Sequence, residues 1–168
     1  RPPGHRALTN DPNSIQGAFM IRPLLVLRTI ALAAYFGGGA AIALIVAPVA
    51  FKTLAPDRAS AGAVVGGALH VFEYAAFGAL GLALAASLTL RWLKQPSLLC
   101  DAAIATLLAG TLFLSAWVSP SLSAARPQGT GAGTEFDRLH KMYERVFGIE
   151  LLVALAALSL SASARKRE

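Results

Sequence analysis

Four apolar runs, each long enough to cross a lipid bilayer, constrain this chain more than any other feature. The first run alone holds about 22 uncharged residues between Thr29 and Ala50, and a membrane-spanning helix needs about 20. We expect helices at residues 23–51, 59–90, 96–118 and 135–163. The sequence therefore predicts an all-α fold, a four-helix transmembrane bundle.

Composition agrees with a lipid environment. The 168 residues are 55% hydrophobic and 14% charged, whereas soluble domains are about 25% charged. The net charge of +6 comes from Lys and Arg beside the apolar runs, with no basic stripe interleaved with stacking aromatics. We therefore expect the lipid bilayer as a partner and no nucleic acid. The lone cysteine, Cys100, supplies neither an intramolecular disulfide nor a zinc pattern.

The chain begins with a polar stretch that we place outside the fold. Residues 1–19 are rich in Pro, Gly and Asn and precede Met20. We expect them to be a disordered or upstream-translated tail, and residues 20–168 to form a single membrane domain. The first apolar run is longer than the apolar part of a signal peptide, so we interpret it as a helix of the bundle.

Glycines, prolines and one acidic residue mark local structure. The triplet Gly37 to Gly39 lies in mid-span, where small residues let a neighbouring helix approach, and we favour this packing role over a ligand contact. Pro48 should kink or end the first helix. Residues 119–134 should form the longest loop, and Thr134 should cap the last helix. Asp101 lies in the first turn of its helix, where a carboxylate interacts favourably with the helix dipole, and we favour this structural role over catalysis.

Four spans place both termini on one face of the membrane. Seven Lys or Arg residues lie next to that face and six next to the other, where acidic residues partly offset them. By the positive-inside rule we expect both termini in the cytoplasm.

Two helix entrances carry the residues that suggest a site. The second and fourth helices enter from the same face, so His70 and His140 should lie at similar depth. Spacing puts His70 and Glu73 on one helix face, and His140 and Glu144 on another. Turned inward, these four side chains would form a metal site for iron, copper, manganese or zinc. His70 and His140 could instead hold a haem iron as axial ligands.

Other roles for these polar residues stay open. Within a turn of the membrane boundary, His and Glu side chains can simply face water or pair with nearby Lys and Arg. They can also line a polar pathway for a proton or small solute. Glu150 lies about 4 residues inside its apolar run, or roughly 6 Å deep. Because a charge in the bilayer is costly, we expect Glu150 to face the bundle or be protonated.

No catalytic motif stands out in the sequence. It has no Walker motif, no phosphate-cradling Gly-rich loop, and no arrangement of nucleophile, base and acid for hydrolysis. We predict a non-enzymatic membrane protein that binds a metal ion, haem or a small cationic solute through His140, Glu144, Glu150, His70 and Glu73. The alternatives are a scaffold or accessory subunit whose glycine-rich helix faces pack against a copy of itself or another membrane protein, and a haem-dependent membrane oxidoreductase.

Several motifs resemble the transmembrane protein 205-like family of small four-helix membrane proteins, whose bacterial members are described as a domain of unknown function. The matching segments are Tyr35-Phe36-Gly37-Gly38, the stretch from Ala47 to Leu54, Ala61-Gly62, and Phe136-x-x-Leu139-His140. The resemblance implies an integral membrane location, in a bacterium the inner membrane, and it includes His140 but not His70. The chain is more distantly similar to copper-resistance D type proteins and to haem-binding membrane protoporphyrinogen oxidases.

Overall fold

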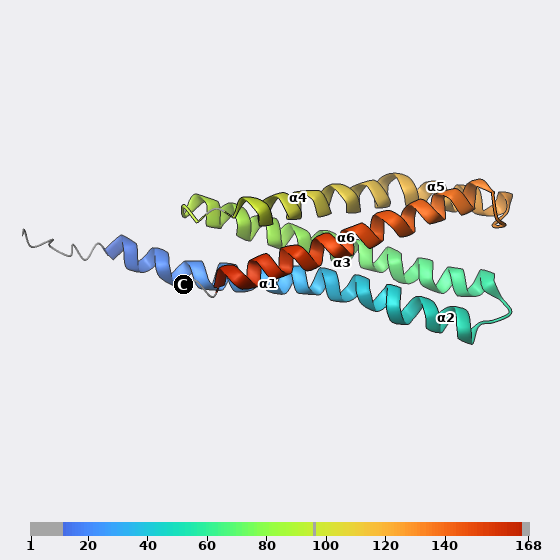
Figure 1. The fold of residues 1–168 in the computed structure, drawn as a ribbon, viewed down its shortest axis with the longest axis horizontal. Coiled ribbons are helices and arrows are strands. Elements are labelled where there is room, and N and C mark those ends of the chain that lie inside the picture. Colours follow the sequence, from blue (N-terminus) through green and yellow to red (C-terminus); the bar gives the residue numbers. More distant parts are fainter. Residues whose placement is uncertain (1–11, 96, 166–168) are drawn as a thin grey trace, which may run out of the picture.

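The structure is a bundle of four long helices (Figure 1). It is a computed structural model that describes residues 12–95 and 97–165. Four helices are long and apolar enough to cross a membrane, over Met20–Thr53, Arg58–Trp92, Leu98–Ala125 and Glu135–Ser163. The predicted all-α four-helix fold is confirmed. Both ends of the described chain lie at the same end of the bundle (Figure 1).

The elements follow one another along the four spans. The first span consists of α1 (Pro12–Ala41), a π-helical turn (Ile42–Val46) and α2 (Ala47–Thr53). The second is α3 (Arg58–Trp92). The third consists of α4 (Leu98–Phe113), a second π-helical turn (Leu114–Val118) and α5 (Ser119–Ala125), which leads into a 3-10 turn (Arg126–Gln128). The fourth is α6 (Glu135–Arg165).

Helix boundaries agree with the expected ones for the second and fourth spans and differ for the other two. Helix α1 begins at Pro12, so residues 12–19 are helical, whereas we expected a tail there. Residues 1–11 and Pro96, the expected start of the third helix, lie outside the described residues. The third span runs on to Ala125, so most of the expected loop 119–134 is helical through Gln128.

The two π-helical turns explain why prolines do not end these helices. Pro48 and Pro120 each stand at the second position after a π turn. A proline lacks the amide donor, and its ring collides with the carbonyl four residues earlier in an α-helix. Those carbonyls belong to Leu44 and Ala116, which lie inside the wider turns. The first helix therefore continues past Pro48 to Thr53 and does not end at the proline.

Small residues in the core bring the helices close together. Helices α1 and α4 each pack against both α3 and α6. The centre of the bundle contains both fully buried leucines and fully buried alanines, including Leu32, Leu80, Leu107, Ala83, Ala154 and Ala157. Gly39 serves the expected packing role, because a Cβ there would lie 2.7 Å from Leu151 Cδ2 on α6. The outer faces carry exposed Leu44, Val71, Leu99 and Leu152, as lipid contact requires.

Side-chain caps begin two of the helices at one end of the bundle. Asp57 Oδ1 accepts hydrogen bonds from the backbone nitrogens of Ala59 (3.1 Å) and Ser60 (3.0 Å) at the start of α3. Thr134 Oγ1 accepts from the Asp137 backbone nitrogen over 3.3 Å at the start of α6, so the expected Thr134 cap is present. These caps fix where the two helices enter the bundle from the same side.

Candidate functional site

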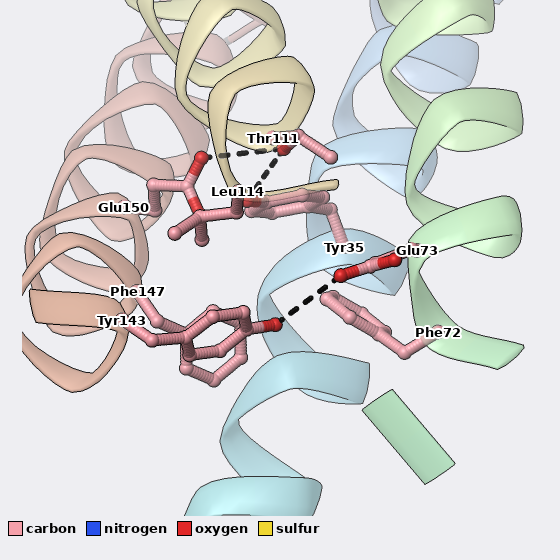
Figure 2. Close-up of a pocket in the computed structure, with 8 residues that line it drawn as sticks. All are labelled: Tyr35, Phe72, Glu73, Thr111, Leu114, Tyr143, Phe147 and Glu150. Atoms are coloured by element: carbon pink, nitrogen blue, oxygen red, sulfur yellow. Dashed lines mark hydrogen bonds between the residues drawn. The ribbon is translucent and has the colours of Figure 1, made fainter. Parts of the chain in front are cut away.

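Two carboxyl groups are buried inside the bundle, Glu73 on α3 and Glu150 on α6, which are 6% and 5% exposed. Both line one cavity of about 10 Å³ (Figure 2), which is room for about one water molecule. Its other walls are three hydroxyl side chains and three apolar ones, namely Tyr35, Thr111, Tyr143, Phe72, Leu114 and Phe147. We call these eight residues the carboxyl site.

Helix periodicity carries both carboxyl groups into the core. Glu73 lies on the same face of α3 as buried Ala76 and Leu80, at spacings of three and seven residues. Glu150 follows buried Phe147 by three residues on α6. Each glutamate therefore occupies a position where the surrounding pattern is apolar, and packing of the neighbouring helices encloses it.

Hydroxyl groups on two other helices hold Glu150. Thr111 Oγ1 on α4 donates to Glu150 Oε1 over 3.3 Å. The Tyr35 hydroxyl on α1 lies 3.2 Å from Thr111 Oγ1. Because Thr111 has a single hydroxyl proton and gives it to Glu150, Tyr35 donates to Thr111. A relay of three side chains from three helices thus ends on this carboxyl group (Figure 2).

Glu73 has its own partners and connects the site with the surface. Its Oε1 accepts from Ser119 Oγ over 2.9 Å and from the Tyr143 hydroxyl over 3.5 Å. Its Oε2 lies 3.8 Å from Nδ1 of His70, whose side chain is 67% exposed. Glu73 therefore stands between a solvent-accessible imidazole and the interior of the bundle.

Four aromatic rings form part of the wall of the carboxyl site. Phe72 packs between Tyr35, at 5.6 Å between ring centroids, and Phe147, at 6.0 Å. Tyr143 lies 6.0 Å from Phe147 by the same measure. These rings leave the carboxyl and hydroxyl groups facing one another in a largely dry space, where each polar interaction is stronger than in water.

The electrostatics of the carboxyl site favour binding of a cation. Among the Lys and Arg side chains that the structure describes, no nitrogen lies within 4 Å of the carboxylates of Glu73 or Glu150. A buried carboxylate without a cationic partner is costly, and two that share one cavity also repel each other. Uptake of one proton relieves both costs.

The residues predicted as metal ligands do not gather. His140 Nε2 and Glu144 Oε1 lie 3.2 Å apart, and their side chains are 50% and 63% exposed. Among the described residues, no group of three or more His, Cys, Asp and Glu side chains is arranged to hold a metal ion. The structure thus does not unite His70, Glu73, His140 and Glu144 as one ligand set. The reason is the rotation of α6 about its own axis, which turns Tyr143 into the bundle and leaves its neighbour Glu144 facing outward.

A second polar layer lies toward the end of the bundle where α6 finishes, and sequence reasoning missed it. Arg28 is fully buried, and its Nε donates to Ser161 Oγ over 3.2 Å. Three buried atoms of the described chain have no hydrogen-bond partner, namely Arg28 Nη2, Ser87 Oγ and Asp101 Oδ1. Asp101 does lie in the first turn of α4, as expected, and its Oδ2 is 3.8 Å from Arg91 Nη2.

The sequence contained only weak signals for the other polar groups. Tyr35, Thr111, Ser119 and Tyr143 all contact a buried glutamate or its partner, yet such residues are common in apolar helices. An arginine inside an apolar run, as at position 28, was the one visible sign of the second layer.

A family model for a domain of unknown function, DUF4149, matches residues 30–130. The chain belongs to this family. No curated protein and no solved structure gives a significant match. The DUF4149 match covers Tyr35, Glu73 and Thr111 of the carboxyl site and ends before α6, which supplies Tyr143 and Glu150. The family description assigns no activity, and the match does not identify the transmembrane protein 205-like family or the copper-resistance D type proteins.

Proposed function

We propose that this protein binds and releases a proton at Glu73 and Glu150, as a proton-coupled membrane protein does. The observation that carries the proposal is the pair of buried carboxyl groups that line one cavity, with no Lys or Arg nitrogen within 4 Å of them among the side chains that the structure describes. Of the small cationic solutes suggested by the sequence, the proton fits best, because a cavity of about 10 Å³ has no room for an organic cation.

The contacts suggest a direction of entry. The exposed His70 imidazole lies 3.8 Å from Glu73, so a proton that enters from water would reach Glu73 beside it. Glu73 and Glu150 then share the cavity, in which one water molecule would bridge proton transfer between them. Tyr143 and Ser119 hold Glu73 in place by donating hydrogen bonds to its Oε1. Thr111 holds Glu150 in place.

Infrared titration of the purified protein in bilayers tests proton binding. The carboxyl band of a protonated buried glutamate should appear in the wild type as pH falls, and Glu150→Gln and Glu73→Gln should each remove part of it. Glu144→Gln is the matched control, since it makes the same change on α6 at an exposed side chain. Equal spectra for wild type and Glu150→Gln would refute the proposal.

The metal and haem hypotheses remain predictions with their own measurement. They assign His70 and His140 to haem, or His140, Glu144, His70 and Glu73 to a metal ion, and the haem version would allow an oxidoreductase. An absorption spectrum and a metal analysis of the purified protein decide this. We expect no Soret band and less than one metal ion per chain. A Soret band would support bound haem, and one or more metal ions per chain would support a metal site.

A scaffold role is the second candidate, favoured by glycines that open outward. Nothing lies within 4 Å of a Cβ built at Gly37, Gly62 or Gly67, whereas Gly38 and Gly39 face Phe72 inside the bundle. A second copy or another membrane protein could pack against the outward set. Replacing Gly67 by Leu should then abolish association in cross-linking experiments, and unchanged association would count against this role.

Location completes the proposal. We infer a bacterial inner membrane protein with both termini in the cytoplasm, and kinship with the transmembrane protein 205-like family, from the basic residues beside the terminal face and the motif that ends at His140. A reporter fused after residue 168 that is active only in the cytoplasm tests the orientation.

A further inference from the structure

A basic groove runs along the outer face of α6 near its start. Arg138, Lys141 and Arg145 follow one another at spacings of three and four residues, so they share a helix face. With Met142 and Val146 they line a shallow groove of about 470 Å³.

Two of the three cations in this groove are available to a ligand. Lys141 Nζ is engaged by Asp137 Oδ2 at 2.8 Å. Glu144, the residue before Arg145, has its Oε1 3.2 Å from His140 Nε2. Within the described part of the chain, no carboxylate oxygen lies within 4 Å of the guanidinium nitrogens of Arg138 or Arg145, and both side chains are exposed.

The same face of α6 becomes apolar as it enters the membrane span. Ile149 and Leu152 follow Arg145 at spacings of four and seven residues, and both are strongly exposed. At 1.5 Å per residue, Leu152 lies about 10 Å deeper than Arg145. The groove therefore offers cations at the level of the lipid headgroups and an apolar track directly below them.

We propose that this groove binds one anionic phospholipid, with its phosphate between Arg138 and Arg145 and an acyl chain along Ile149 and Leu152. Guanidinium groups suit phosphate because they donate two parallel hydrogen bonds. A soluble acidic peptide or nucleic acid would use the cations but not the apolar track, which lies inside the bilayer. The proposal is independent of proton binding, because none of these residues lines the carboxyl site.

Native mass spectrometry of the detergent-solubilised protein tests this, with phosphatidylglycerol and phosphatidylcholine of identical acyl chains as probes. Each basic residue near a membrane surface contributes about 1 kcal/mol toward anionic lipid, so two predict a preference of about 30-fold. The double variant R138Q/R145Q should lose most of it. The double variant K52Q/R58Q removes the same charge from exposed side chains at the same end of the bundle and should keep it.

Three outcomes would overturn the proposal. They are no preference in the wild type, an equal loss in both double variants, and displacement of the lipid by millimolar inorganic phosphate, which would show that the acyl chain contributes nothing. Circular dichroism of each variant confirms that the helices remain, so a loss of lipid is not a loss of fold.

Discussion

Arg28 and Ser161 are 133 positions apart in the chain, yet Arg28 Nε donates a hydrogen bond to Ser161 Oγ over 3.2 Å inside the bundle. Ser161 Oγ also lies 2.8 Å from Thr29 Oγ1. This contact ties α1 to α6 at the end opposite His70. It buries a guanidinium group whose Nη2 has no protein partner in the described chain.

Ser161→Ala should destabilise the bundle by about 1–3 kcal/mol, because it removes an acceptor from a buried charged donor. Arg28→Met should cost less or be neutral, since it removes the buried charge together with its unpartnered nitrogen. Thermal unfolding in detergent, followed by circular dichroism, compares the two. A larger loss for Arg28→Met than for Ser161→Ala would show that the arginine is better satisfied than its contacts indicate.

Gly39→Ala should destabilise the fold by about 1–3 kcal/mol, because its methyl group would lie 2.7 Å from Leu151 Cδ2 and 3.2 Å from Phe147 Cζ. Gly37→Ala, two residues earlier, meets nothing within 4 Å. It should be neutral or stabilise α1 by up to about 1 kcal/mol, the helix preference of alanine over glycine. Unfolding midpoints in the same detergent measure both, and equal midpoints would contradict the packing at Gly39.

Gly110→Ala should disturb the carboxyl site more than the fold. A Cβ at position 110 would press against the Glu150 carboxyl group, so Glu150 should turn away and lose its bond from Thr111. We expect the infrared band assigned to Glu150 to shift while the helix content stays the same. Gly148→Ala is the control on α6, where a Cβ has open space. A shift of equal size in the control would assign the effect to general repacking.

The start of α3 should loosen in acid through Asp57. Hydrogen bonds from the Ser60 hydroxyl and backbone amide hold the pKa of Asp57 below its ordinary value of 3.8. A carboxyl group whose pKa is lowered in the folded state stabilises it above the unfolded pKa, and this contribution is lost as pH falls through the folded pKa. Hydrogen exchange at the Ala59 and Ser60 amides, corrected for intrinsic rates, should therefore lose protection below about pH 4. Asp57→Asn should remove this pH dependence, and an unchanged dependence would point to another group.

Tertiary packing chose among polar residues that look equivalent in the sequence. His140 and Glu144 were as plausible an inward pair as His70 and Glu73. The core face of α6 instead runs through buried Tyr143 and Phe147, which leaves His140 and Glu144 exposed. Rotating a helix about its axis by one residue position is enough to exchange the buried and exposed residues. No local pattern in so apolar a chain specifies this rotation.

By itself the sequence determined four apolar spans, the approximate ends of the second and fourth, the Thr134 cap and the common side of the two termini, because span length, turn chemistry and capping are local properties. Only the tertiary structure decided that Pro48 and Pro120 follow π turns within continuous helices. It also decided that Thr111 links Tyr35 to Glu150, and that Arg28 is paired with Ser161. These outcomes depend on how the four helices rotate and pack against one another. In a membrane the outer face of a helix is apolar as well, so close packing rather than a polar outer face sets the rotation.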